Sequence, residues 1–184
     1  MARIIKSLSL LIFGVLSTNA YSQEIVKAGL IRTQLTISPT YNFADNQSHF
    51  YLHGTAESYF DKNLSIAGEG YYYLGSLNSE NSEFDFNHSI FFGTSYHFII
   101  NKNDLYVGIQ PGISITKINN QENDLLIANT GVNPLISPVL GYNFYINKIF
   151  HFFIQSRFVI GEHNHDVQKN LTEYRFSAGL GLNL

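Results

Sequence analysis

Apolar and polar residues alternate with a period of two along most of the chain after residue 22. Alternation of this kind predicts β-strands with one apolar and one polar face, and no stretch keeps the 3.6-residue period of a helix. The segments exceed the mean strand length of roughly five or six residues and reach the roughly nine to eleven that a tilted membrane-crossing strand needs. The eight segments are 29–42, 48–60, 64–77, 84–99, 104–117, 133–146, 149–161 and 171–184.

The connections between these segments alternate in length. Short polar turns occupy 61–63, 100–103 and 147–148, and longer polar links occupy 43–47, 78–83, 118–132 and 162–170. Short turns that alternate with longer links are typical of up-and-down barrels of the bacterial outer membrane, where turns face the periplasm and loops face outward. Eight strands that start in the periplasm also return the C-terminus to the periplasm.

The two faces of the segments differ in a way that indicates which one lies inside. The polar faces consist of small, weakly charged residues, which suit the narrow interior of an eight-stranded barrel better than a water-facing surface. In the last segment the apolar face carries Tyr174, Phe176, Ala178, Leu180, Leu182 and Leu184, and the opposite face carries Glu173, Arg175, Ser177, Gly179, Gly181 and Asn183. Phe153 and Ser156 interrupt the alternation, and Pro111 predicts a bulge or local break in its strand.

Aromatic residues are sorted along the apolar faces. One expected girdle, near the periplasmic ends, contains Phe60, Tyr96, Phe98, Tyr142, Phe144, Phe150 and Phe152. The other, near the loop ends, contains Tyr41, Phe43, Phe50, Phe84, Phe86, Phe158, Tyr174 and Phe176. The positions between them are mostly aliphatic, with Phe92 as an exception. Two aromatic girdles around an aliphatic belt are the expected signature of two membrane interfaces.

The composition excludes several functional classes. Aromatics make up 15% of the chain and charged residues only 14%, against roughly 25% charged residues in soluble domains. The absence of cysteine excludes disulfides, thiolate metal sites and a cysteine nucleophile. The net charge is −3 without a basic block, so nucleic-acid binding has no electrostatic support.

The first 22 residues have the organisation of a secretory signal peptide. Arg3 and Lys6 form a basic start, 8–16 an apolar core, and Ala20 and Ser22 are the small residues before a cut at Gln23. The apolar run is too short to span a bilayer. Cleavage would remove two positive charges, so the net charge changes from −3 to −5. We expect a signal peptide at 1–22 and one barrel domain at 23–184.

The pattern from Gly29 to Leu184 resembles the small eight-stranded outer-membrane β-barrels, such as outer membrane protein X and the transmembrane domain of outer membrane protein A. The resemblance lies in the alternation, not in a diagnostic motif, and the last strand ends in Leu184 where members typically end in an aromatic residue. It implies an all-β, antiparallel, up-and-down transmembrane barrel. The implied partners are outer-membrane lipid, lipopolysaccharide and the barrel-assembly machinery, with no cofactor and a monomeric state.

Seven charged residues are predicted to point into the lumen: Arg32, Glu57, Glu69, Asp85, Arg157, Glu173 and Arg175. We expect them to form an ion-pair network, because an unpaired charge in a narrow lumen is strongly destabilising. Arg32 and Arg175 lie on the first and last segments, which become neighbours on closure, and Glu57, Glu69 and Glu173 are their expected partners. The alternative is an ion-conducting path or gate, for which eight strands leave little room.

The histidines and hydroxyl residues give no complete catalytic or metal site. His163-Asn164-His165-Asp166 offers an HxH spacing without a further separated ligand, which favours a solvated loop. His49 and His53 share the lumen face and are interpreted as polar filler. Small barrels that deacylate or acylate lipid A would need a nucleophile with a base. The nearest candidate, His53-Gly54-Thr55, is predicted to face the lumen and not the lipid. His88 and Ser89 are adjacent and therefore point to opposite faces, so they cannot act as a pair.

Three hypotheses follow from the sequence. The first is a non-enzymatic outer-membrane barrel with a plugged, ion-paired lumen and a structural or loop-mediated role. The second is a secreted soluble barrel of lipocalin type that binds an apolar ligand, with Phe150, Phe152 and Phe158 inside and Arg157 and Arg175 in water. The third is a lipid A-modifying outer-membrane enzyme, which rests on family precedent alone.

Overall fold

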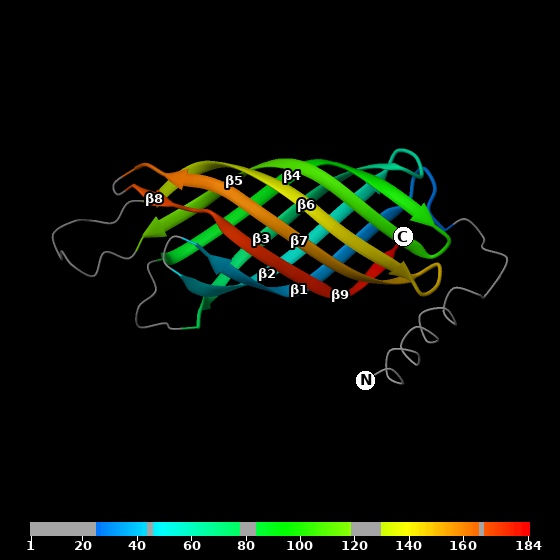
Figure 1. Cartoon of the computed structure of the whole chain (residues 1–184), viewed down its shortest axis with the longest axis horizontal. Helices are drawn as coiled ribbons and strands as arrows, with labels where there is room; N and C mark the ends of the chain where they lie inside the picture. Colours follow the sequence, from blue (N-terminus) through cyan, green and yellow to red (C-terminus); the bar gives the residue numbers. More distant parts are fainter. Residues whose placement is uncertain (1–24, 44–45, 78–83, 119–129, 166–167) are drawn as a thin grey trace, which may run out of the picture.

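A computed structural model describes residues 25–43, 46–77, 84–118, 130–165 and 168–184, which form a closed antiparallel β-barrel (Figure 1). The predicted signal peptide lies outside the described residues. The strands are β1 (Ile31–Asn42), β2 (Gln47–Tyr59), β3 (Leu64–Ser76), β4 (Phe84–Ile100), β5 (Asn103–Ile118), β6 (Thr130–Tyr145), β7 (Phe150–His163), β8 (Lys169–Asn170) and β9 (Glu173–Asn183).

Eight long strands make the wall of the barrel. Each pairs with the next in antiparallel fashion, and β1 pairs with β9 to close the sheet. The two-residue β8 pairs only with the end of β7. The short turns lie at the end of the barrel where the C-terminus is found, and the strand ends that border the longer connections lie at the opposite end (Figure 1). We call these the turn end and the loop end. The predicted strand number and topology are confirmed.

Short polar side chains shape the turns at the turn end. The Asp61 carboxylate accepts hydrogen bonds from the backbone N–H groups of Asn63 and Leu64, at 2.6 and 2.9 Å. The Asn147 side chain accepts from Ile149 and Phe150, both at 2.8 Å. Because these side chains satisfy backbone donors that have no ladder partner, Asp and Asn favour tight reversals at these positions.

The alternation of the sequence becomes an alternation between lumen and exterior. β6 alternates between exposed and buried positions throughout, with Phe144 as its one intermediate residue. β7 keeps the alternation through Phe153, which is buried in the lumen. Ser156 faces outward and donates a hydrogen bond to the Tyr174 hydroxyl at 2.9 Å. These two residues therefore place an apolar side chain on the lumen face and a polar one on the outer face, while the strand itself stays regular.

Pro111 interrupts pairing on one side only. The β4–β5 ladder skips the residues between Phe91–Gly112 and Thr94–Ile109 without a register shift, whereas β5 pairs continuously with β6. Proline has no N–H to donate, so the ladder with one neighbouring strand, β4, is interrupted while the ladder with the other, β6, is kept. The predicted break is therefore limited to the β4–β5 ladder, and β5 itself continues through Pro111 as one strand.

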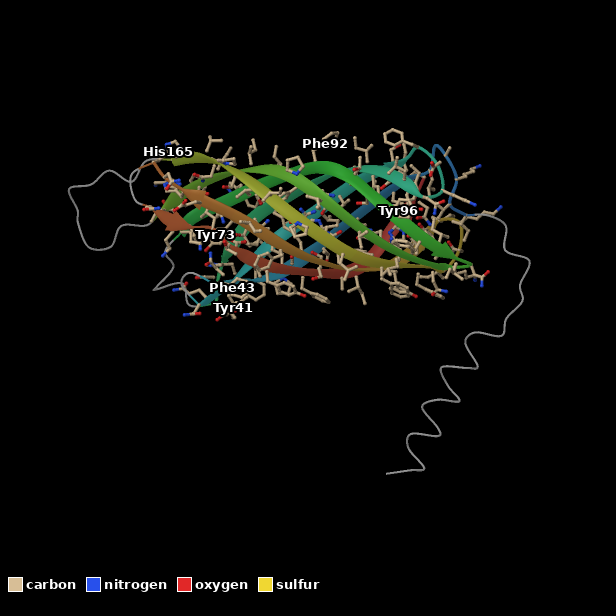
Figure 2. The ribbon with its side chains drawn as sticks, turned by 45° about the horizontal axis from the view of Figure 1, so that its top comes forward. Tyr41, Phe43, Tyr73, Phe92, Tyr96 and His165 are labelled. Carbon is tan, nitrogen blue, oxygen red and sulfur yellow. The ribbon has the colours of Figure 1, made fainter. Side chains whose placement is uncertain are left out.

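The exposed aromatic side chains gather toward both ends of the barrel. Tyr41 and Phe43 lie near the loop end and Tyr96 near the turn end, with Phe92 between them (Figure 2). The Tyr41 and Phe43 ring centroids are 5.4 Å apart, and the Phe43 and Phe158 centroids 5.7 Å. Exposed are Phe60, Tyr96, Phe98, Tyr142, Phe150, Phe152, Tyr41, Phe43, Phe158, Tyr174 and Phe176, and intermediate are Phe50, Phe86 and Phe144.

Phe84 corrects the expected girdle near the loop end. Its side chain is 2% exposed and packs in the lumen with Ile118 and Leu171. Register explains the difference, because the β4–β5 ladder shifts between Phe84 and Phe86. A one-residue slip moves a side chain to the other face of the sheet.

No helix among the described residues is long and apolar enough to cross a membrane.

Candidate functional site: three ion-pair clusters in the lumen

The charged residues of the lumen gather into three clusters along the barrel. The first lies near the turn end and centres on Arg32. Its guanidinium binds the Glu57 carboxylate through Nε at 2.9 Å and also through Nη2. Nη1 donates to Asp104 at 2.9 Å and to the Tyr145 hydroxyl at 3.0 Å. All four residues are buried, so one guanidinium from β1 connects β2, β5 and β6 across the lumen.

His97 completes this first cluster. Its Nδ1 lies 2.8 Å from Asp104 and its Nε2 lies 3.1 Å from Glu57. A carboxylate only accepts hydrogen bonds, so both ring nitrogens act as donors when both contacts are made. Arg32 and the imidazolium then balance the two carboxylates, which meets the requirement that buried charges be paired.

The second cluster lies midway along the lumen and centres on Glu69. Arg157 contacts its carboxylate at 2.7 Å, Gln155 donates to it at 2.7 Å, and Gln110 donates at 3.0 Å. The His53 Nε2 lies 3.1 Å from the same carboxylate. The Arg157 guanidinium also lies 4.3 Å from the Phe91 ring centroid, a cation–π contact that offsets part of its loss of hydration.

The third cluster lies toward the loop end. Arg175 binds Glu173 at 2.9 Å and donates to Ser89 at 2.7 Å. Glu173 also accepts from Tyr51 at 3.1 Å and from Asn87 at 2.9 Å. The Arg175 guanidinium lies 4.3 Å from the Tyr51 ring centroid.

Aromatic side chains lie between the clusters. Tyr106 donates to Gln155 at 2.8 Å, and its ring centroid lies 5.3 Å from that of His97, so it joins the first cluster to the second. Tyr71 lies under both Arg157 and Arg175, at 5.6 and 4.5 Å from its ring centroid. The lumen is therefore a stack of ion pairs separated by rings.

Apolar side chains fill both ends of the lumen. At the turn end, Val26 and Leu30, which precede β1, are buried against Tyr59 and Tyr145. The backbone N–H of Gly29 donates to the Tyr59 carbonyl at 2.9 Å, which holds this segment against the wall. A second buried apolar cluster extends from the middle of the lumen to the loop end and contains Tyr51, Tyr71, Tyr73, Phe84, Phe91, Ile118, Leu135, Val159 and Leu171.

Six of the seven charged residues predicted to face the lumen are buried: Arg32, Glu57, Glu69, Arg157, Glu173 and Arg175. Asp85 is a correction, because its side chain is 49% exposed and pairs with Lys117 on the exterior at 2.6 Å. The register shift next to Phe84 places Asp85 outside. Of the three carboxylates expected as partners of Arg32 and Arg175, Glu57 pairs with Arg32 and Glu173 with Arg175, whereas Glu69 pairs with Arg157.

Asp104 and His97 belong to the first cluster, and sequence reasoning missed both. Asp104 shares the parity of Tyr106 and Gln110 on the polar face of its strand. His97 alternates with the exposed Tyr96 and Phe98. The alternation along β4 and β5 alone could have placed both residues in the lumen. They were overlooked because both lie close to the turn between these two strands.

Tyr106 occupies the space that a side chain at position 141 would need. A Cβ added to Gly141 would overlap the Tyr106 ring and hydroxyl. Gly141→Ala is therefore expected to displace this ring and to cost about 1–3 kcal/mol of unfolding free energy, the usual cost of overpacking. The loss of unfolding free energy is measured by denaturant titration, with the folded fraction read from the gel band of the unheated protein. Gly70→Ala is the control, since a Cβ there meets nothing within 4 Å.

The histidines beyond the clusters form no metal site with any other described residue. His163 and His165 have ring centroids 5.4 Å apart, and Asp166 lies outside the described residues. Within the part of the chain that the structure describes, no group of three or more metal-binding side chains occurs. His163 is buried, which corrects its expected place in a solvated loop.

A hydroxyl, an imidazole and a carboxylate meet at His53, but not in the order that a catalytic relay needs. Thr55 Oγ1 lies 3.0 Å from His53 Nε2, and Glu69 approaches the same nitrogen at 3.1 Å. In a nucleophile–base–acid relay the hydroxyl and the carboxylate bind different ring nitrogens. His53 is also fully buried, so a substrate could not reach it.

No protein-family model matches the sequence, and no curated protein matches it. Solved structures do match the fold. The N-terminal β-barrel domain of Pseudomonas aeruginosa OprF is 12% identical with a TM-score of 0.60, over 86% of this chain and 99% of that one. Neisserial surface protein A is 12% identical with a TM-score of 0.65, over 84% and 96%.

A third match is the outer membrane protein OprG from Pseudomonas aeruginosa, which is 10% identical with a TM-score of 0.66, over 86% of this chain and 97% of that one. At such identities the likeness extends to the fold and not to activity. The matches cover nearly the whole length of these barrels, and this chain likewise forms a closed barrel of eight long strands. The chain has the fold of the small eight-stranded outer-membrane β-barrels.

Proposed function

We propose that this protein is a non-enzymatic integral barrel of the bacterial outer membrane, with an occluded, ion-paired lumen. It is exported by the signal peptide at 1–22 and acts as a structural element or through its loops. The observation that carries the proposal is the inverted polarity of the barrel. Large apolar side chains such as Leu35, Ile109 and Phe92 are exposed, whereas Arg32, Arg157 and Arg175 are almost fully buried.

Inverted polarity supports a membrane location for a physical reason. A soluble monomer rarely exposes a contiguous apolar patch larger than a few hundred Å², whereas here exposed apolar side chains occur on all eight long strands. In a bilayer the same surface faces hydrocarbon, and a closed barrel leaves no unpaired strand edge there. Lipid and lipopolysaccharide are then the immediate surroundings of the barrel, which we expect to be monomeric.

The three clusters and the apolar ends support an occluded lumen. Eight strands enclose an interior that is just wide enough for side chains. The ion pairs span it from wall to wall, as in the contacts of Arg32 with Glu57 and Asp104. Opening a path would leave buried charges unpaired, at a cost of several kcal/mol.

The arrangement also favours the membrane barrel over the other two hypotheses. A soluble ligand-binding barrel requires Phe150, Phe152 and Phe158 inside, and all three are exposed. A lipid A-modifying enzyme requires a nucleophile and base on the lipid-facing side. His88 faces outward, whereas Ser89 is buried against Arg175.

Membrane fractionation and gel migration test the location. We expect the full chain to fractionate with outer membranes and to migrate differently on gels before and after heating, because a closed barrel resists detergent until heated. The assembly machinery is required for this insertion, so its depletion should leave the heat-sensitive form unformed. Recovery as a soluble periplasmic protein without detergent would contradict the proposal.

Electrical recording tests the lumen. Folded protein added to a planar bilayer is expected to give no sustained conductance step, because its ion pairs and apolar ends fill the interior. The folded 16-stranded porins, which leave an aqueous channel, serve as the positive control. A stable open level in most recordings would contradict the occluded lumen and leave the membrane location intact.

A further inference from the structure

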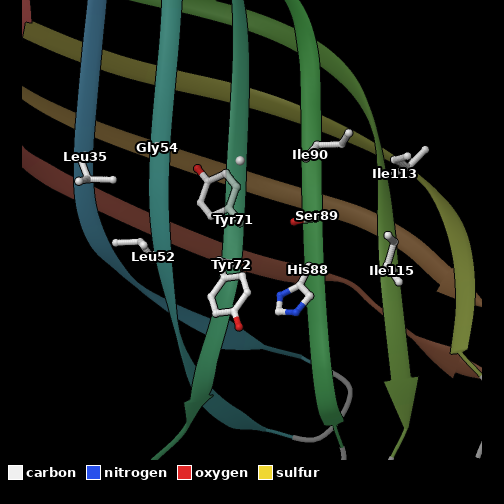
Figure 3. A pocket seen from close by; sticks show the side chains of 11 residues that line it. Leu35, Leu52, Gly54, Tyr71, Tyr72, His88, Ser89, Ile90, Ile113 and Ile115 are labelled. Atoms are coloured by element: carbon white, nitrogen blue, oxygen red, sulfur yellow. The ribbon is translucent and has the colours of Figure 1, made fainter.

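The lipid-facing exterior of the barrel is hollowed by a groove. This groove of about 410 Å³ runs over the lipid-facing side of β1 to β5, walled by Leu35, Leu52, Tyr72, Ile90, Ile113 and Ile115 (Figure 3). Its floor is at Gly54 and Gly70, where the strands have no side chain. Its volume falls within the range of about 300–1,000 Å³ typical of small-ligand sites.

The groove continues toward the loop end because β3 and β4 separate there. Their ladder stops at Tyr71–Ser89, although β3 extends to Ser76 and β4 begins at Phe84. A bulge at Leu74, between the Phe50–Gly75 and Tyr51–Tyr73 pairs, bends β3 at this point. A second depression of about 390 Å³ lies between the separated strands and shares Tyr72 and His88 with the groove.

His88 marks the boundary between the two depressions. Its ring stacks on Tyr72 and Phe86, with centroids 4.3 and 5.2 Å apart. Its Nδ1 accepts a hydrogen bond from the Tyr73 backbone N–H at 3.0 Å. The imidazole therefore supplies the acceptor that the missing ladder partner would have supplied.

The same contact leaves a hydrogen-bond donor in the groove. Because Nδ1 accepts, the neutral ring carries its proton on Nε2. None of the described residues hydrogen-bonds this nitrogen. A donor on a lipid-facing surface is costly without an acceptor, so Nε2 indicates a ligand that brings one.

The surrounding residues indicate the chemistry of that ligand. The groove below His88 is aliphatic, and Asp85 and Lys117 lie beyond Phe86 toward the loop end, in an exposed ion pair. An occupant must therefore place an acyl chain in the membrane interior and an oxygen acceptor at the interface. Since the loop end faces outward in barrels of this kind, the groove lies in the outer leaflet, where the acylated lipid is lipopolysaccharide.

We propose that this groove holds one acyl chain of an outer-leaflet lipid A, with an ester or amide carbonyl accepting from His88 Nε2. The site binds and does not react, since the neighbouring Ser89 hydroxyl lies behind β4 on the lumen side (Figure 3). The inference rests on the proposed membrane location and adds a specific lipid site to it.

Native mass spectrometry of the folded mature chain in mild detergent tests the site, with lipid A and a phosphatidylethanolamine of matched chain length as probes. We expect the unaltered protein to hold one lipid A more tightly than phosphatidylethanolamine. Gly70→Leu should abolish this adduct by filling the floor, where a Cβ meets nothing within 4 Å. His88→Phe keeps the ring and should weaken binding about three- to tenfold, the value of one hydrogen bond.

Ala178→Leu is the matched control, since Ala178 is an exposed small residue on β9, outside the groove, and should leave the adduct unchanged. Gly54→Leu replaces Gly70→Leu if the latter does not fold, because a Cβ there makes only ordinary contact with Leu35 at 3.7 Å. Equal lipid A retention by all variants would overturn the proposal, as would equal loss in the control.

Tighter binding of phosphatidylethanolamine at the same site would overturn the assignment to lipid A. The heat-dependent gel shift of each variant separates this inference from the proposed function. A chain that inserts and shifts normally but shows no lipid adduct refutes only the groove, whereas a chain that never inserts refutes both.

Discussion

Arg32→Met is expected to lower the unfolding free energy of the barrel by about 3–5 kcal/mol, the largest effect of any single lumen substitution. Arg32 is the permanently charged residue that binds both Glu57 and Asp104 in the first cluster. Its removal leaves two buried carboxylates with His97 as their remaining cationic partner. Denaturant titration of the folded gel band in detergent or vesicles measures the change.

Two further variants show that the loss comes from unpaired buried charge. Lys117→Met removes an exposed ion pair, with side chains 36% and 49% exposed, and should cost less than about 1 kcal/mol. Adding Glu57→Gln and Asp104→Asn to Arg32→Met should restore part of the stability, because the neutral amides need no counter-charge. A loss for Arg32→Met no larger than that for Lys117→Met would contradict the buried network.

Ile109→Arg is expected to cost about 2–4 kcal/mol, because its position places a charge near the middle of the hydrocarbon. Ile109 is already 65% exposed in the isolated chain. In a soluble protein, a substitution at such an exposed site would usually stay within about 0.5 kcal/mol. Unfolding from phospholipid vesicles, followed by gel shift, measures the difference.

Ile100→Arg is the matched control at the turn end of the same barrel. Ile100 is 70% exposed and ends β4, so its arginine can reach the interface, where the expected cost is about 0–1 kcal/mol. A depth-dependent difference between the two variants requires a surrounding bilayer. Equal, small effects at both positions would count against the membrane location.

Much of the barrel could be predicted from local pattern. A strand places successive side chains on opposite faces, so the alternation in 133–146 and 171–184 separated two faces. The small, weakly charged residues of the polar face then indicated that this face is the interior. Short polar turns such as Asp61-Lys62-Asn63 were recognisable because Asp and Asn satisfy backbone donors locally. These inferences need no knowledge of distant residues, which is why strand number, order and closure agree with the structure.

The residues predicted on the wrong face lie where the alternation of the strand shifts by one residue. Phe84 and Asp85 were placed on the wrong faces because the β4–β5 register changes between Phe84 and Phe86, and a single residue of slip reverses both faces. Pro111 was recognised because its missing N–H is a property of the residue itself. A register shift instead depends on the partner strand, so the sequence of one strand does not reveal it.

By itself, the sequence determined the architecture: eight alternating segments, the turns between them, and the face on which most charged residues lie. Only the tertiary structure decided which charges meet, because barrel closure brings Arg32 to Asp104 over 72 positions and Gln155 to Glu69 over 86. The groove at His88 likewise exists only in three dimensions. It arises where glycines on neighbouring strands align and two strands separate, and the sequence of a single strand records neither event.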